Sequence, residues 1–183
     1  YSIASDATSL PSYATVSMTG QTSHFWTDST SDVRALQQAS STTGRVAAAW
    51  FSYSSFMVNV SFNDGKEHQL TAYMMDWTNY GRSQKVELID ADTGKVLDTQ
   101  NLSNFKDGAY MSWTVSGNVR LRFTRTGGTN ALLNGLFFDS AASSGGSSQD
   151  GIDEAPATED VDLKTQGNWK NTYGSAGYSI SSD

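Results

Sequence analysis

Tyr80 is an aromatic residue whose surroundings suit a chemical role, because polar residues flank it in Asn79-Tyr80-Gly81-Arg82. A flat tyrosine ring can stack on the C–H face of a sugar ring, whose hydroxyl groups then need amide or charged partners. The Arg82 guanidinium can donate to such hydroxyls, and it can also hold a sugar carboxylate in a bidentate pair. Because loops often carry function, Tyr80 and Arg82 predict a carbohydrate contact.

Other aromatic residues in polar stretches are candidates for the same role. Trp26 follows His24 and Phe25, Tyr53 lies among serines, and two more aromatic residues occupy a Gly- and Asn-rich stretch near residue 170. Aromatic residues of that last stretch can instead dock their own segment on the domain, and both alternatives stay open. The candidate carbohydrate-binding residues are Trp26, Tyr53, Tyr80, Arg82, Trp169, Lys170 and Tyr173. Three tryptophans in strand-like contexts are expected in the core, namely Trp50, Trp77 and Trp113.

Catalytic chemistry is poorly represented. The sequence has no nucleophile elbow, phosphate-binding loop or His-Glu-x-x-His motif. A pair of carboxylates for glycoside hydrolysis could come from a set of four, Asp76, Glu87, Asp90 and Asp92, but a sequence does not show which of them converge. We therefore expect a chain that is not itself an enzyme.

Metal chemistry has few ligands to draw on. There is no cysteine, so thiolate sites and disulfides are excluded, and there are two histidines. The acidic run from 150 to 162 lacks the ligand order of an EF-hand and is interpreted as a solvated spacer. No cofactor is expected to be required, and a structural calcium ion is left open.

The predicted elements are short strands. Residues 56–62 place Phe56, Val58 and Val60 on one face and polar residues on the other, which is typical of a half-buried strand. A turn at 63–66 then leads to a partner strand at 70–77. Residues 45–51 fit a helix or a strand, and a short helix capped by Ser31 or Asp32 is predicted at 32–38. Further strands are expected at 84–90, 96–99, 110–115, 119–124 and 132–138.

This pattern predicts an all-β fold, an antiparallel β-sandwich of jelly-roll type. Residues 1–139 are predicted to form the sandwich module, without an opening strand of its own. Residues 140–162 read as a Ser/Gly-rich and then acidic linker. The end of the chain, Tyr178 to Asp183, nearly repeats its beginning, Tyr1 to Asp6. Residues 163–183 therefore resemble the start of a further tandem repeat, which closes the sandwich in cis or in trans.

Composition narrows the class of partner. The net charge of −7 argues against nucleic acid, and no apolar run is long enough to span a membrane. Abundant Ser, Thr and Asn with 17% charged residues suit a secreted all-β domain, so we expect an extracellular location. With no initiator Met and no signal peptide, the chain is interpreted as a mature fragment or an excised region.

Six runs in the middle of the chain form a recognisable set: Ala48 to Phe51, His68-Gln69, Asp76-Trp77, Gly81 to Gln84, Asp90 to Thr99 and Asn130 to Asp139. Together they resemble the β-sandwich modules appended to secreted bacterial polysaccharide-degrading enzymes. They are similar to the xanthan-binding carbohydrate-binding module of endoxanthanases. The resemblance implies a non-catalytic module that binds xanthan or a related β-glucan-backbone polysaccharide and targets an attached glycoside hydrolase. It also implies neighbouring repeat modules and a catalytic domain in the parent chain.

Two other functions remain open. The chain could be a structural spacer or a protein–protein adhesion module in a secreted array, in which case the loop aromatics should be buried. It could also be a small glycan lyase or hydrolase, which would need carboxylates or a Tyr/Arg cluster in a groove.

Overall fold

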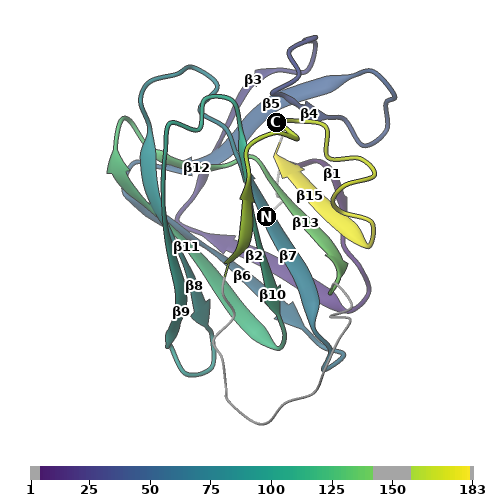
Figure 1. The fold of residues 1–183 in the computed structure, drawn as a ribbon, viewed down its shortest axis with the longest axis vertical. Helices are drawn as coiled ribbons and strands as arrows, with labels where there is room; N and C mark the ends of the chain where they lie inside the picture. Colours follow the sequence, from purple (N-terminus) through teal and green to yellow (C-terminus); the bar gives the residue numbers. More distant parts are fainter. Residues whose placement is uncertain (1–4, 142–157, 182–183) are drawn as a thin grey trace.

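The computed structural model describes residues 5–141 and 158–181 and shows an antiparallel β-sandwich (Figure 1). One layer is a six-stranded sheet in the order β1 (Ser5–Ser9), β15 (Gly177–Ser181), β13 (Gly135–Ser140), β7 (His68–Met74), β10 (Ala109–Val115) and β14 (Thr158–Asp162). The opposite layer is a five-stranded sheet in the order β2 (Ala14–Thr19), β6 (Ser55–Phe62), β11 (Asn118–Gly127), β8 (Ser83–Asp90) and β9 (Val96–Ser103). The predicted fold class is therefore confirmed.

A smaller sheet lies at one end of the sandwich (Figure 1). It contains β12 (Ala131–Leu133), β5 (Arg45–Ser52) and β3 (Thr22–Thr27), and the short strand β4 (Leu36–Gln37) also pairs with β5. The segment 45–51, which fits either helix or strand by its pattern, is thus a strand whose residues from 46 to 50 are buried.

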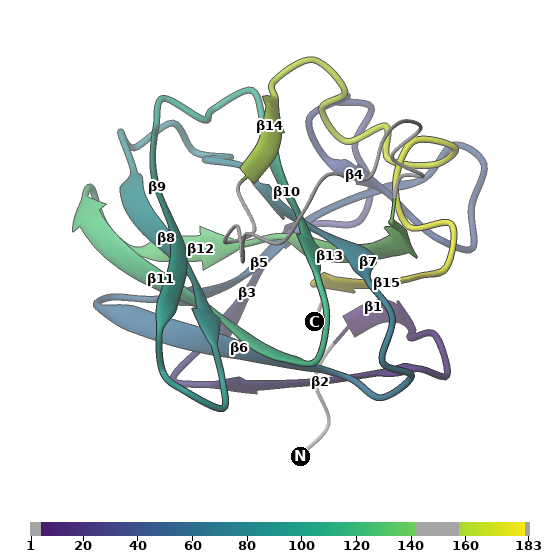
Figure 2. The ribbon, with the colours of Figure 1, turned by 60° about the horizontal axis from the view of Figure 1, so that its bottom comes forward.

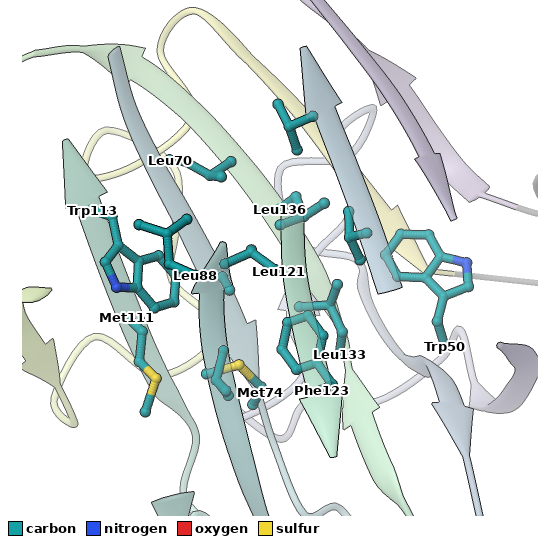
Figure 3. Packing of buried hydrophobic residues seen from close by; sticks show 14 of the residues in the cluster. Trp50, Leu70, Met74, Leu88, Met111, Trp113, Leu121, Phe123, Leu133 and Leu136 are labelled. Carbon is teal, nitrogen blue, oxygen red and sulfur yellow. The ribbon is translucent and has the colours of Figure 1, made fainter. Parts of the chain in front are cut away.

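The main core fills the space between the two large sheets, as Figure 3 shows. Every second side chain of β6 points into this core, and each of these is 5% exposed or less: Phe56, Val58, Val60 and Phe62. Trp113 on β10 and Trp50 on β5 are also buried there, as expected, whereas Trp77 is only half-buried.

A second apolar cluster covers the other face of the six-stranded sheet. Tyr73 and Phe137 point to this side, and the segment that precedes β15 packs on them with Trp169. The yellow segment lies over this face in Figures 1 and 2. The six-stranded sheet is therefore covered on both sides, which explains why β7 is buried along almost its whole length.

Two predictions of local structure are wrong. No helix forms at 32–38, because the Asp32 carboxylate accepts hydrogen bonds from the Arg34 backbone and side chain and so closes a turn. Val33, an apolar residue within this segment, is 46% exposed. The strand after the 63–66 turn is also not the partner of β6: β6 pairs with β2 and β11, and β7 pairs with β10 and β13.

The strand predicted at 132–138 divides at Asn134 into β12 and β13, which belong to different sheets. The buried Asn134 amide stabilises this break. Its Oδ1 accepts from the backbone N–H of Met75 at 2.7 Å, and its Nδ2 donates to the carbonyl of Ala48 at 2.7 Å. The break turns β12 outward, toward the end of the sandwich that carries the small sheet.

The predicted linker, residues 140–162, differs from the structure at its C-terminal end. Thr158 to Asp162, expected in the linker, forms β14 on the edge of the six-stranded sheet, and residues 142–157 of that linker lie outside the described residues. β15 pairs with β13 and β1 of the same chain. The tandem repeat itself stays a prediction.

Candidate functional site

The candidate site is a hollow of about 300 Å³ on the face of the small sheet. Its walls come from β3, β5, β12 and three connections between strands. The lining residues are His24, Trp26, Phe51, Tyr53, Thr78, Tyr80, Arg82, Thr129, Asn130 and Leu132. A volume of this size is at the lower end for ligand sites in proteins and holds about ten water molecules.

Aromatic rings follow one another across the floor of the hollow. The rings of His24 and Trp26 on β3 meet edge to face with centroids 4.8 Å apart. Phe51 on β5 contacts His24 at 6.3 Å and Tyr53 at 5.4 Å, both nearly perpendicular. The antiparallel register explains the row, because Phe51 lies opposite Thr22 of β3 and Leu132 of β12. Side chains opposite one another share a face of the sheet.

Tyr53 and Tyr80 project into solvent at the rim. They are 71% and 64% exposed, which is unusual for large aromatic side chains. Tyr53 lies in the tight connection between β5 and β6, and Tyr80 lies in the connection between β7 and β8. Neither ring has a core to fill, so both are accessible to a ligand.

The connection that carries Tyr80 is held by a buried ion pair. Asp76 and Arg82 are 2% and 5% exposed, and Arg82 Nη1 donates to the Asp76 carboxylate. The same carboxylate accepts from the backbone N–H groups of Tyr80 at 3.2 Å and Arg82 at 3.0 Å. The Asp76 carboxylate therefore closes the loop around itself and fixes the backbone below the Tyr80 ring.

Two further hydrogen bonds of Arg82 tie its guanidinium to its own loop and to the connection before β12. Nη1 also donates to Thr78 Oγ1 at 2.7 Å, and Nε donates to Asn130 Oδ1 at 2.6 Å. The guanidinium carbon lies 5.4 Å from the centre of the Tyr80 ring. Close backbone approach completes this junction: a Cβ on Gly128 would lie 2.7 Å from Arg82 Cα.

The hollow is consequently close to electrically neutral. The Asp76 carboxylate compensates Arg82, and none of the described lining residues carries a carboxylate of its own. The hydrogen-bonding groups that remain are hydroxyls, an amide and an imidazole. Such a set suits a neutral, hydroxyl-rich ligand that offers apolar faces to the aromatic rings.

Four of the seven predicted residues come together here: Trp26, Tyr53, Tyr80 and Arg82 line one hollow. Arg82 lies in it differently from the expectation, because its guanidinium is already occupied by Asp76, Thr78 and Asn130. A bidentate grip on a sugar carboxylate is therefore not open to it in this arrangement.

The other three predicted residues dock the segment before β15. Trp169 is 5% exposed and donates from Nε1 to the Gln37 carbonyl at 2.8 Å. Lys170 Nζ donates to the carbonyls of Ala39 and Ser41 at 3.2 and 2.6 Å, and the Tyr173 ring stacks on Tyr110 at 4.4 Å. The structure thus favours the alternative of tail docking, and none of the three residues lines the hollow.

The four candidate carboxylates do not form a catalytic pair in the hollow. Asp76 is held by Arg82, and Glu87 accepts from Arg122 on the outer face of β8. Asp90 caps the turn at 91–95 by accepting from two backbone N–H groups, and Asp92 accepts from Asn118. Each carboxylate thus has a local structural partner.

Sequence reasoning did not select Phe51, Thr129 or Asn130 as site residues. Phe51 belongs to a strand that reads as core, and only the strand order shows that it faces outward. Thr129 and Asn130 follow Gly127 and Gly128. This pair of glycines is the one sequence signal that the backbone here lies close to another loop, the one that contains Arg82.

Within the described ranges, no group of three or more His, Asp or Glu side chains is placed to hold a metal ion. Those ranges also contain no helix of the length and apolarity that crossing a membrane requires.

No protein-family model matches this sequence, and no curated protein matches it. Among solved structures, the chain is similar to the carbohydrate-binding module TmCBM61, determined in complex with β-1,4-galactotriose. The two share 11% identity, the match covers 72% of this chain and 87% of the other, and the TM-score is 0.37. Similarity of this degree carries no argument about the ligand of this chain.

Proposed function

We propose that the chain binds a polysaccharide in this hollow without cleaving it. The observation that carries the proposal is the pair of exposed rings, Tyr53 and Tyr80, at the rim of a hollow floored by His24, Trp26 and Phe51. Sugar rings stack on such surfaces, and a buried loop scaffold holds Tyr80 in place before any ligand arrives. Preorganisation of this kind lowers the entropic cost of binding.

The proposed ligand is xanthan or a related polysaccharide with a β-glucan backbone. Neutral glucose rings of a backbone suit the neutral lining, with Thr129 and Asn130 beside them as hydrogen-bonding partners. In this role the chain is a secreted, extracellular module that brings an attached glycoside hydrolase to its substrate. Repetition of such modules would raise the effective concentration of weak sites.

Of the alternatives, a structural spacer is disfavoured by the exposed aromatic rim, since a spacer has no use for it. Hydrolysis is disfavoured because it needs two carboxylates, and none of the described residues that line the hollow carries one. Tyr80 and Arg82 do form a Tyr/Arg cluster, as a lyase would require, but the Asp76 carboxylate neutralises the guanidinium. An assay for new reducing or unsaturated ends tests both enzymatic alternatives.

The test is affinity electrophoresis in native gels that contain xanthan, hydroxyethylcellulose, carboxymethylcellulose or a neutral gum. The Tyr53→Ala/Tyr80→Ala variant removes the rim, and Leu163→Ala removes an apolar side chain that is 59% exposed outside the hollow. We expect the wild type and Leu163→Ala to be retarded by at least one glucan gel and the double variant to migrate as in a blank gel. Free migration of the wild type in all gels would favour the spacer.

A further inference from the structure

The outer face of the five-stranded sheet carries an unusual group of cations. Along β11 the side chains of Val119, Leu121 and Phe123 enter the core, so Arg120 and Arg122 stand on the opposite, solvent-facing side. The register places Arg122 opposite Glu87 of β8 and Arg120 opposite Ile89. Lys85 occupies the same face of β8, two positions before Glu87.

Ion pairing leaves this face positive. Glu87 is the acidic residue among these groups, and it accepts from Arg122 Nε at 2.8 Å and from Lys85 Nζ at 3.0 Å. Two cations therefore share one carboxylate. Arg120 forms no ion pair or side-chain hydrogen bond with any residue that the structure describes. The face thus has an excess of positive charge on a chain whose net charge is −7.

The cations lie in successive rows that lead away from the hollow. Lys85 lies on β8 three positions after Arg82, which precedes the strand and lines the hollow. Arg120 lies opposite Ile89, four positions further along β8. At a rise of about 3.3 Å per residue, the rows from Lys85 to Arg120 extend over roughly 13 Å. At the far end, Asp92 accepts from Asn118 and marks the limit of the positive surface.

The rest of this face combines polar residues with three apolar ones and lacks aromatic rings. The apolar residues are Met57, Ile89 and Val96. The aromatic residues of its described strands, Phe56, Phe62 and Phe123, all point into the core. Asn59 lies opposite Arg120, and Asn101 lies opposite Lys85. Single-stranded nucleic acid needs aromatic stacking platforms, so this surface fits a hydroxylated polymer with carboxylates better.

We propose that the Lys85–Arg122–Arg120 surface is a second carbohydrate site, which binds the carboxylate groups of an anionic polysaccharide. Its positive charge is complementary to such a polymer, although the chain as a whole is acidic. Local attraction outweighs the distant negative charges because salt screens interactions beyond about 8 to 10 Å. Binding here does not require the hollow to be occupied.

The test compares two polymers with the same β-glucan backbone, anionic carboxymethylcellulose and neutral hydroxyethylcellulose. The variant is Lys85→Gln/Arg120→Gln, which keeps Arg122 as the partner of Glu87. The control is Lys66→Gln/Lys164→Gln, which changes the net charge equally at exposed lysines on other parts of the surface. Thermal unfolding midpoints equal to that of the wild type show that both variants are folded.

We expect the affinity of Lys85→Gln/Arg120→Gln for carboxymethylcellulose to fall by about three- to tenfold at low salt, with hydroxyethylcellulose binding and the control unchanged. Unchanged affinity, or an equal loss on both polymers, overturns the proposal. Stronger retention by a single-stranded oligonucleotide than by carboxymethylcellulose overturns the assignment to polysaccharide. The Tyr53→Ala/Tyr80→Ala variant reports on the hollow separately, so failure of one site is distinguishable from failure of the other.

Discussion

Replacing Arg82 with alanine should destabilise the protein far more than a loop substitution normally does. Asp76 is 2% exposed and its charge is compensated by Arg82, which is itself 5% exposed. Removing one partner of a buried pair leaves an uncompensated charge and costs about 3–5 kcal/mol. Typical surface substitutions change stability by about 0.5 kcal/mol or less.

A double-mutant cycle isolates the interaction itself. Arg82→Ala, Asp76→Ala and the double variant are unfolded in urea at pH 7 and 25 °C, with tryptophan fluorescence as the signal. The double variant should be more stable than the sum of the single effects predicts, by a coupling energy of about 0.5–3 kcal/mol. A cost below about 1 kcal/mol for Arg82→Ala would refute the description of this loop as built on a buried ion pair.

The remaining predictions concern the tail, one carboxylate and one glycine. Trp169→Ala should lower the free energy of unfolding in urea by about 3–5 kcal/mol through a lost buried ring, while the dissociation constant for polysaccharide stays unchanged. The hydrogen bond from Arg122 lowers the pKa of Glu87 below its ordinary 4.5. The ionised Glu87 carboxylate therefore stabilises the fold above pH 4.5, and this stabilisation is lost as the pH falls through the lowered pKa. In the Glu87→Gln variant, the urea midpoint should fall less steeply between about pH 5 and pH 3 than in the wild type. Gly128→Ala should cost about 1–3 kcal/mol in the same assay, since its φ is +68° and the new Cβ would meet Arg82; no measurable change would contradict the close loop contact.

Period-two alternation was a reliable guide to the strands. Residues 56–62 alternate as predicted, and the strands expected at 84–90 and 96–99 are present as β8 and β9. The strands that pair with β7 were harder to predict from the sequence. β7 is buried on both faces and has no alternation that would assign it to one sheet. The break at Asn134 depends on hydrogen bonds to Met75 and Ala48, both distant in sequence, and no local pattern reveals them.

The candidate site likewise contains residues whose exposure follows from local sequence and residues whose environment depends on tertiary contacts. Tyr53 and Tyr80 lie in short polar connections, where local sequence decides exposure, and both rings are exposed. Trp169 also lies among polar residues, but its exposure is decided by Gln37 and Phe137, which approach it only in the folded chain. Arg82 was selected for the chemistry of its side chain, whereas its burial with Asp76 is a tertiary property.

The position of β15 has a consequence for the order in which the fold is completed. β15 lies between β1 and β13, and among the described strands β1 pairs with β15 alone. While a ribosome is still making the chain, Ser5–Ser9 has no sheet to join and one edge of β13 stays unpaired until Gly177–Ser181 emerges. Contacts between segments so distant in sequence also form slowly. A nascent or truncated chain that ends before residue 177 therefore presents an open strand edge to other chains, which makes aggregation during synthesis a hazard specific to this topology.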